Sequence, residues 1–409
     1  VPIAMSLGLS AMGGILFLGG GSTVTIAQRM FEGMNSFALL AIPLYTFAGF
    51  TMSKGGISKR LMDFCYSIVG HIYGGLAHVN VLSSMIFAGI SGSAVADTAG
   101  VSGMFMPEMV RKGYSKNFTV AVTAISSTIG IIIPPSIPMV VIAGICGIST
   151  GKLFLGGIIP GVLCGLAQMI VSYFMAKKEG VPKEPGHFTI GPVLHGLWES
   201  WPALLMPIII VGTITMGIVS PTEAGVIAVV YGLFAGGIIY RELKWEDIKF
   251  AFAETVRTSG RIFIVIGAAK LYTVMLTTAG FDKWVAKTML GFSTNPTVIL
   301  IVILLIFFIV TMFMESIATL TLFMPILYPI ALGVGINPIV LSVLITVVIG
   351  VGLVTPPVGM CIYVACDLMD VTVGEVFPTL VPFIAATFVC IALMVAFPQL
   401  ILLPTYLMA

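Results

Sequence analysis

The chain has 409 residues, of which 58% are hydrophobic and only 9% are charged, whereas roughly 25% of the residues in a soluble domain are charged. This composition excludes an ordinary soluble protein and predicts an integral membrane protein. The 19 basic and 17 acidic residues give a net charge of +2, which is too small for a nucleic-acid partner. Because lipid offers the backbone no hydrogen-bond partner, the apolar runs predict an all-α fold with roughly ten to twelve crossings or half-crossings of the bilayer.

Motifs of common enzymes are absent from the sequence. It has no Walker or GxGxxG phosphate loop, no HExxH metal motif and no CxxC pair. The six cysteines lie inside apolar runs, where small buried hydrophobic residues are expected. An intramembrane enzyme would need Asp97 and Glu315 as an acid and base pair, but no nucleophile or metal motif accompanies them. The sequence therefore predicts no catalytic residues and no enzymatic activity.

Residues 1–90 are expected to form scaffold helices. The chain opens inside an apolar run without a start methionine, so we expect an upstream helix to be missing. Residues 3–18 and 37–52 are apolar enough to span, whereas residues 23–35 mix apolar and charged positions as an interfacial helix does. Three basic residues follow the second of these spans and indicate a cytoplasmic turn: Lys54, Lys59 and Arg60.

The sequence SGSAVAD, at residues 91–97, is too polar and too rich in small residues for a helix that faces lipid. It includes Asp97, and a charged residue at the bilayer centre costs at least ~2.5 kcal/mol. Small residues alone could serve close helix packing, but packing does not explain the carboxylate. We therefore expect a re-entrant helical hairpin whose broken tip lies in protein or beside a watery cavity.

The proline pair Pro134-Pro135 interrupts an apolar run at residues 118–146. Proline removes its own amide and blocks the helix ladder, so the pair should unwind about one turn and leave carbonyl oxygens without partners. A kink satisfied by hydroxyl groups or water is the structural alternative. Since hard cations take oxygen ligands, a Na⁺ ion is a suitable partner for such carbonyls.

The longest polar stretch, at residues 177–200, is expected to be a cytoplasmic linker. Its basic residues are Lys177, Lys178 and Lys183. Residues 201–295 are expected to form further scaffold helices, with an amphipathic arm on the membrane surface at residues 241–261. Lys270 stands alone in an apolar run. Snorkelling is the commoner fate of such a lysine, and contact with substrate is the functional alternative.

The second half of the chain repeats the first. Asp97 and Glu315 each stand ten residues before the proline of an FMP motif, and Pro134 and Pro356 each stand 26 residues before a later proline. Repeats at near-fixed spacing build many secondary transporters. Basic residues follow the first hairpin, whereas the matching stretch at residues 328–338 has none. We therefore expect inverted repeats, each with a re-entrant hairpin and a Pro-Pro-broken helix, whose hairpins enter from opposite sides of the membrane.

These features divide the chain into six parts. In order, they are scaffold helices (1–90), the first repeat core (91–176), the linker (177–200), scaffold helices with the arm (201–295), the second repeat core (296–384) and a C-terminal span (385–409). The closing span is expected at residues 383–408.

Two Na⁺ sites are expected at the broken segments, because hydroxyl, carboxylate and free carbonyl oxygens gather there. The first site comprises Ser91, Gly92, Ser93, Asp97 and the carbonyls near Pro134. The second site comprises Glu315, Ser316, Gly352, Thr355 and the carbonyls near Pro356. The candidate substrate contacts are Ser93, Ser136 and Lys270.

The motifs SGSAVADTAG, PEMVRKGYSKNF, IIIPPSIPM, FMES and TPPVGM closely resemble those of the large membrane subunit of tripartite ATP-independent periplasmic (TRAP) transporters. The resemblance covers essentially the whole chain, with the motifs in the same order. It implies an elevator-type transport domain, two coupling Na⁺ ions and a place in the bacterial inner membrane. It also implies a small membrane subunit and a soluble periplasmic binding protein that delivers an organic acid, such as sialic acid or a C4-dicarboxylate.

A stand-alone Na⁺/organic-anion symporter of the divalent-anion symporter type is the alternative, since the resemblance in fold extends to that family. The hairpins of those symporters carry Ser-Asn-Thr motifs, whereas this chain has Ser91-Gly92-Ser93 and Glu315-Ser316-Ile317. The two hypotheses differ in one requirement, because only the TRAP assembly needs a binding protein.

Overall fold

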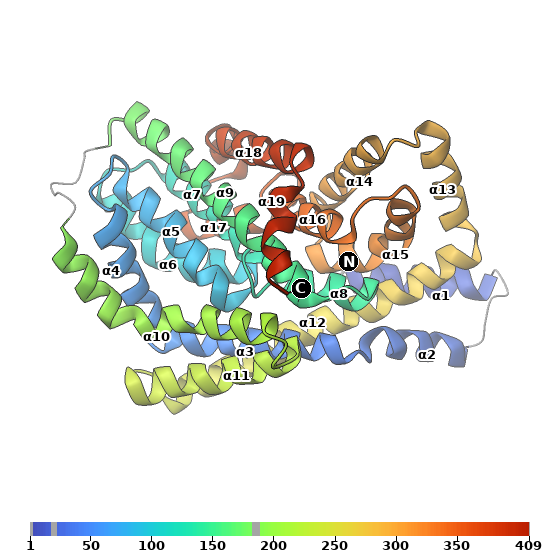
Figure 1. Cartoon of the computed structure of the whole chain (residues 1–409), viewed down its shortest axis with the longest axis horizontal. Coiled ribbons are helices and arrows are strands. Elements are labelled where there is room, and N and C mark those ends of the chain that lie inside the picture. Colours follow the sequence, from blue (N-terminus) through green and yellow to red (C-terminus); the bar gives the residue numbers. More distant parts are fainter. Residues whose placement is uncertain (1–2, 18–22, 182–188, 409) are drawn as a thin grey trace.

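A computed structural model describes residues 3–17, 23–181 and 189–408, and within these ranges every regular element is a helix (Figure 1). Among the described residues, seven helices are long and apolar enough to cross a membrane, and six further apolar helices have 10–17 residues. The seven are Phe37–Lys54, Thr150–Lys178, Ile190–Thr215, Pro221–Ile239, Trp245–Thr278, Ser316–Gly333 and Val373–Ala396. The expectation of an all-α, multi-pass membrane protein is confirmed.

Two pairs of consecutive helices pack against each other as hairpins. The first pair is α5 (Gly75–Ser91) and α6 (Ala94–Arg111), and the second is α14 (Pro296–Thr311) and α15 (Ser316–Gly333). The first arm thus begins at Gly75, so the boundary expected at residue 90 cuts α5 near its end. The reason is local, because Gly74 takes a left-handed conformation with φ 75 and ends the turn after α4 (Ile57–Val69).

Each hairpin is followed by a helix that is interrupted at a proline pair. The first consists of α7 (Lys116–Ser127), the 3₁₀ turn η2 (Thr128–Ile131) and α8 (Ile137–Cys146). The second consists of α16 (Pro338–Gly352) and α17 (Met360–Met369). Both Pro-Pro peptide bonds are cis. We call residues 132–136 the first break and residues 353–359 the second break.

The two halves of the chain exchange partners. Helix α8 packs on α15 of the second hairpin, and α17 packs on α6 of the first. The following helices, α9 (Thr150–Lys178) and α18 (Val373–Ala396), likewise pack on α16 and α7. In Figure 1, α17 accordingly lies among α5, α6 and α7, while α8 lies below α15 and α16. Each half thus covers helices of the other.

Six other helices lie along one side, which is the lower edge of Figure 1, and we call them the scaffold helices. They are α1 (Ile3–Phe17), α2 (Thr23–Met34), α3 (Ala41–Lys54), α10 (Ile190–Thr215), α11 (Pro221–Phe234) and α12 (Trp245–Thr278). The short helix α13 (Phe281–Phe292) joins α12 to α14. Helix α12 connects this side to the second hairpin, because it packs on α1, α2, α3 and α15.

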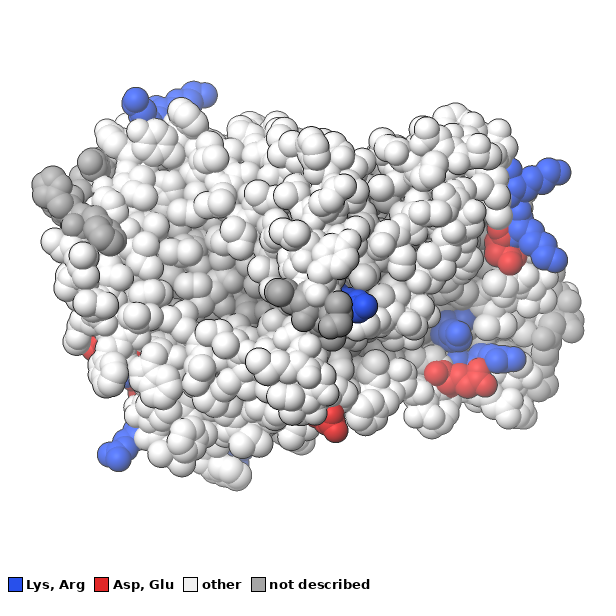
Figure 2. Space-filling model, in the orientation of Figure 1, with Lys and Arg blue, Asp and Glu red and all other residues white. Residues whose placement is uncertain are grey.

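Charged side chains on the face shown in Figure 2 gather mainly toward the two ends of the long axis, and much of the middle carries no charge. Large apolar side chains are exposed on the long helices, including Ile208, Val230 and Val389 at 65%, 61% and 59%. Exposed apolar side chains and absent charges are what a hydrocarbon environment requires.

Two further expected boundaries fall inside helices. The linker ends earlier than residue 200, because α10 already begins at Ile190, and Gly196 packs against Phe64 of α4. Lys183 lies outside the described residues, as do Val1 and the rest of residues 182–188. The arm expected at residues 241–261 is the first part of one 34-residue helix, α12, which continues through Lys270. The helix continues because the residues after 261 are mostly apolar and include no proline before Thr278.

The closing span is also displaced. Its helix, α18, runs from Val373 to Ala396 rather than over residues 383–408, so a boundary at residue 385 falls inside it. A capping box of Thr372 and Glu375 starts the helix. Pro398 ends it, since the residue before a proline is disfavoured in the helical region, and Phe397 has φ −126 and ψ 72.

Candidate ion and substrate site

The first hairpin tip, residues 91–93, is a sharp break between two helices. Helix α5 ends at Ser91, and Gly92 follows in the left-handed region with φ 64, which glycine adopts without a Cβ penalty. Ser93 is the N-cap of α6, and its hydroxyl accepts a hydrogen bond from the amide of Ala96 at 3.4 Å. The sequence SGS thus encodes one helix end, one reversal and one helix start.

Asp97 lies in the first turn of α6 and is completely buried. Its Oδ1 accepts a hydrogen bond from the Ser91 hydroxyl, which ties the two sides of the tip together. Its Oδ2 accepts no hydrogen bond from the described residues and lies against Gly130 of η2, where an added Cβ would overlap it. Glycine at position 130 therefore makes room for the carboxylate, and Oδ2 is available to a further ligand.

The first tip rests on the first break. The amide of Ile137 donates a hydrogen bond to the carbonyl of Gly92 at 3.2 Å. A Cβ added at Gly92 would lie 2.6 Å from the carbonyl oxygen of Pro135. The structure thus brings together the hairpin and the proline pair, as the sequence predicts. The contacts between the hairpin and the proline pair are made by backbone atoms rather than by charged side chains.

Ser136 satisfies some of the backbone groups that the first break leaves without helical partners. Its buried hydroxyl donates to the carbonyl of Ile131 and accepts a hydrogen bond from the amide of Met139, as the N-cap of α8. The expectation that the carbonyls here lack partners is therefore wrong for Ile131. A serine placed directly after the proline pair supplies the donor that the broken helix ladder has lost.

The second tip, residues 312–315, is built differently. Glu315 is itself the N-cap of α15, and its carboxylate accepts hydrogen bonds from the amides of Ile317 at 2.9 Å and Ala318 at 3.2 Å. The hydroxyl of Ser316 donates to the same carboxylate at 3.1 Å. An acidic cap also complements the positive end of the helix dipole.

The second tip rests on the second break through a matching backbone bond. The amide of Val358 donates to the carbonyl of Met312 at 3.0 Å. Thr355 donates its hydroxyl to the carbonyl of Val351 at 2.7 Å, so that hydroxyl is also satisfied inside its own segment. A Cβ at Gly352 would lie 2.7 Å from Cβ of Thr311, which shows how closely α16 approaches α14.

The two carboxylates that sequence spacing aligns do not hold equivalent places. Glu315 is the cap of its helix, whereas Asp97 lies four residues after the cap Ser93. Four residues are about one helical turn. When the two halves are aligned by their FMP motifs, their helix starts are therefore offset by about one turn. As a result, Asp97 lies one turn inside α6, whereas Glu315 lies at the start of α15.

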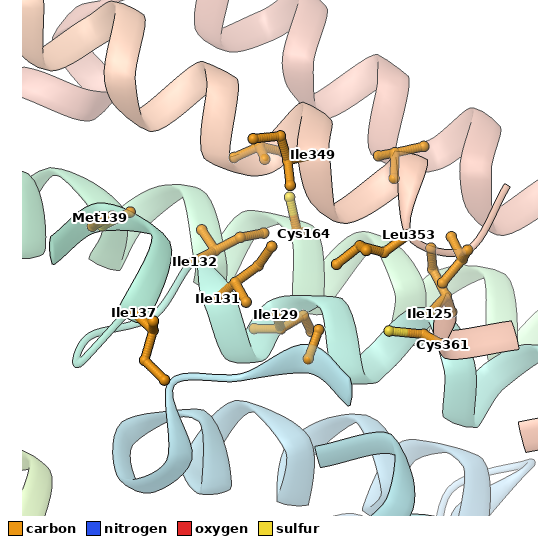
Figure 3. Packing of buried hydrophobic residues seen from close by; sticks show 14 of the residues in the cluster. Ile125, Ile129, Ile131, Ile132, Ile137, Met139, Cys164, Ile349, Leu353 and Cys361 are labelled. Carbon is orange, nitrogen blue, oxygen red and sulfur yellow. The ribbon is translucent and has the colours of Figure 1, made fainter. Parts of the chain in front are cut away.

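Between the two breaks, apolar side chains are close-packed (Figure 3). Ile129, Ile131 and Ile132 from the first broken helix face Ile349 of α16 and Leu353, the first residue of the second break, with Cys164 of α9 beside them. A Cβ at Gly350 would lie 3.2 Å from Cβ of Thr128. The two broken helices thus contact each other through a layer of apolar side chains.

The candidate substrate residues do not form one group. Ser93 lies at the first tip and is partly exposed, while Ser136 is buried with its hydroxyl engaged on both sides. Lys270 is exposed on α12, and a Cβ at Gly33 of α2 would lie 2.7 Å from its Cβ. Lys270 therefore stands on the scaffold beside α2.

A buried polar group that sequence reasoning missed lies between α5 and α7. The amide of Asn80 bonds Thr123 and Ser126, and the hydroxyl of Ser84 bonds that of Ser126. The available signal was an asparagine in the apolar run LAHVNVLSSM, since polar residues within spans mark interhelical hydrogen bonds or functional sites.

The oxygen groups at both tips are of the kind that could hold a hard cation. They are hydroxyls, backbone carbonyls and one carboxylate per tip, which is the ligand chemistry of alkali and alkaline-earth ions. In the described part of the chain, no group of three or more His, Cys, Asp and Glu side chains is placed to hold a metal ion.

Residues 1–400 match the family model for the DctM component of the tripartite ATP-independent periplasmic transporter. The large sialic acid permease protein SiaM of Vibrio cholerae is 34% identical over 98% of this chain and 94% of its own length. The large C4-dicarboxylate permease protein DctM of Pseudomonas aeruginosa is 35% identical over 98% and 94%.

One relative is longer than this chain. The isethionate permease protein DctMQ of Oleidesulfovibrio alaskensis is 37% identical over 94% of this chain, which spans only 61% of that relative. Among solved structures, the YdaH transporter of Alcanivorax borkumensis has the same fold, with a TM-score of 0.61 at 13% identity over 92% of this chain and 88% of its own. Its likeness supports the helical transporter fold alone.

Family membership also settles two broader questions. The relatives are transport permeases and not enzymes, and they are inner-membrane proteins, in line with the seven candidate spans. From its motifs, its fold and a family match over residues 1–400, this chain belongs to the tripartite ATP-independent periplasmic transporters as a large permease (DctM) component.

Proposed function

We propose that this chain is the transport subunit of a Na⁺-coupled importer, in which at least two Na⁺ ions bind at the hairpin tips and an organic acid is moved by an elevator mechanism. The observation that carries the proposal is the matched pair of backbone hydrogen bonds, Ile137 to Gly92 and Val358 to Met312. Each bond fixes a helix-breaking tip against a proline-broken helix, and such discontinuous helices hold substrate and ions in secondary transporters.

The first ion is placed by this proposal among Ser91, Ser93 and Asp97. A carboxylate oxygen without a hydrogen bond is costly inside protein at membrane depth, and a cation beside Oδ2 of Asp97 offsets that cost. The second ion is placed at Ser316, Thr355 and the carbonyls of the second break. Glu315 supplies negative charge there while its oxygens also cap α15.

An elevator mechanism requires that both tips move as one body. The exchange of partners between the halves supports such a body, because α8 packs on α15 and α17 packs on α6. The apolar layer around Ile131, Ile349 and Leu353 would move with the tips. The lower-edge helices of Figure 1 would then be the stationary scaffold.

The substrate is proposed to be a small organic acid. The names of the relatives specify sialic acid, C4-dicarboxylates and isethionate, all of which are anions. Neither tip, at residues 91–93 or 312–315, contains Arg or Lys. Main-chain amides at the start of α6 and the hydroxyl of Ser93 are therefore the proposed carboxylate contacts, since helix N-termini favour anions and the first amides of α15 already donate to Glu315.

The partners follow from the family, whose description is tripartite. We propose a small membrane subunit and a periplasmic binding protein that delivers the acid. A site without a bidentate Arg clamp is expected to bind free substrate weakly, so affinity must come largely from the binding protein.

Uptake by proteoliposomes tests this function. Vesicles would hold this chain with its small subunit, under an inward Na⁺ gradient, and would receive radiolabelled sialic acid, succinate or isethionate with and without the cognate binding protein. We expect uptake only with Na⁺ and the binding protein together, and a sigmoidal dependence on Na⁺ from two ions. Equal uptake without the binding protein would assign a stand-alone symporter, and uptake that ignores Na⁺ would refute ion coupling.

A further inference from the structure

We propose that Asn80 is a positioning residue that latches the first hairpin to the broken helix α7 and thereby sets the geometry of the first ion site. The proposal rests on the proposed function for the meaning of that site. It goes beyond it by naming a residue outside the tips, and by predicting that the two hairpins differ in how firmly they are held.

Asn80 contacts two helices besides its own. It lies on α5 and is completely buried. Its Nδ2 donates to Oγ1 of Thr123 at 2.7 Å, and its Oδ1 accepts from Oγ of Ser126 at 3.1 Å, both on α7. Its Nδ2 also lies 3.8 Å from Sδ of Met109 on α6. One amide thus connects both arms of the hairpin to the first broken helix.

Polar residues on α5 and α7 lead from Asn80 to the first ion site. Asn80, Ser84 and Ser91 are spaced by four and seven residues, so they share one face of α5. Ser84 bonds Ser126, and Ser91 bonds Asp97. On the other side, α7 leads from Thr123 and Ser126 into η2, where Gly130 receives Asp97. The spacing between α5 and α7 therefore determines where Ser91 stands relative to Asp97.

Hydrogen bonds are effective in this role because of the environment. Helices in a bilayer gain no hydrophobic stabilisation from meeting, since lipid tails are as apolar as leucine. Interhelical polar bonds and close packing hold them instead. A buried amide with both of its ends bonded fixes register as well as distance, because losing either partner leaves a buried polar atom unsatisfied.

The second hairpin has no such latch. The matched backbone bonds align Gly92 with Met312, so Asn80 aligns with Leu300 and Ser84 with Leu304. Every residue of α14 from 298 to 310 is apolar. The proline pairs align Thr123 with Ile345 and Ser126 with Val348, which are apolar as well. The two buried hydroxyls of α16, Ser342 and Thr346, bond carbonyls in their own helix segment.

Amide hydrogen exchange of the full chain in lipid nanodiscs, read by mass spectrometry, tests the latch. Thr123→Val removes the acceptor of Asn80 with almost no change in shape. Thr346→Val makes the same chemical change at a buried hydroxyl that has no bond to another helix. Thr123→Ser keeps the hydroxyl and should restore the latch. Exchange of α5 amides in K⁺ buffer should be about three- to tenfold faster in Thr123→Val than in Thr346→Val.

Titration with Na⁺ alone then reads the site. In Thr123→Val, the Na⁺ concentration that gives half-maximal protection of residues 88–97 should rise about three- to tenfold, while that for residues 312–318 stays unchanged. Equal behaviour of Thr123→Val and Thr346→Val in both measurements would overturn the proposal. If Na⁺ protects neither tip in the unmodified chain, the proposed ion coupling fails, and the α5 exchange in K⁺ buffer alone decides for or against the latch.

Discussion

The two hairpin tips share one plan and differ in burial. At the first tip, Ser91 and Asp97 are 6% and 0% exposed, and the break beneath it is almost entirely buried. At the second tip and break, Phe313 and Val358 are 57% and 41% exposed. The first tip is therefore enclosed by protein, whereas the second opens to its surroundings. Under the proposed function, the two ions would therefore differ in their access to the surroundings.

The difference arises from the neighbours of each tip rather than from the tips themselves. The first tip has α3 behind it, since a Cβ at Gly49 would lie 3.2 Å from Cα of Ser91. It also has Pro207 of α10 beside Gly89. Scaffold helices therefore cover one tip at close range. Under the elevator proposal, a scaffold that grips the first tip must release it during transport.

The largest effect is expected from Gly92→Ala. The new side chain would be strained in the left-handed region, at about 1–2 kcal/mol, and would also lie 2.6 Å from the carbonyl oxygen of Pro135. Overpacking of this kind adds about 1–3 kcal/mol. Gly180→Ala is the matched control, with φ 68 and open space around it. Thermal unfolding in detergent should show the larger loss for Gly92→Ala, and equal losses would mean that the tip does not rest on the break.

The next effect separates the two glycines that precede the breaks, Gly130 and Gly352. Gly130→Ala would overlap the Asp97 carboxylate and cost about 1–3 kcal/mol. Asp97→Ala should relieve much of that loss, because only Cβ of Asp97 would remain, at 3.7 Å. Gly352→Ala should not be relieved by Thr311→Ala, since the contact there is to Cβ of Thr311 itself. Unfolding temperatures of the two double variants decide the matter.

A smaller effect is expected when the tip hydroxyls are removed. Ser91→Ala takes away the only hydrogen bond that Asp97 receives from a described side chain, whereas Ser316→Ala leaves Glu315 with two backbone amides. The Na⁺ concentration for half-maximal uptake should rise about tenfold for Ser91→Ala, equivalent to about 1.4 kcal/mol, and less for Ser316→Ala. The reverse order would mean that the exposed tip binds the ion more tightly.

The smallest effect concerns the charge at the second tip. Glu315→Gln keeps an oxygen acceptor for the amides of Ile317 and Ala318 and removes the charge, whose interaction with the helix dipole contributes about 0.3–1 kcal/mol. Because the proposed second ion uses this charge, the Na⁺ concentration for half-maximal uptake should rise slightly while the unfolding temperature falls slightly. An unchanged Na⁺ dependence would mean that Glu315 acts only as a cap and is not part of the ion site.

Sequence patterns predicted much of the fold for identifiable reasons. Composition requires a membrane, the SGS motif encodes a helix reversal through Gly92, and the proline pairs interrupt helices because proline lacks an amide. Boundaries were less certain. Pro398 ended α18 earlier than hydropathy suggested, and α12 was longer than its amphipathic first part. Hydropathy depends on the average composition of a segment, whereas helix ends depend on capping residues and on individual backbone conformations.

The sequence by itself determined the membrane class, the two broken segments and the kinds of oxygen atoms available at each, because these depend on local residue chemistry. Only the tertiary structure decided which carboxylate is buried and which is a cap, since Asp97 and Glu315 have the same spacing to their FMP motifs but stand one turn apart relative to their tips. It also decided that Asn80 meets Thr123, 43 residues away. Contacts between distant segments follow from how helices pack, and no local pattern in either segment specifies its partner.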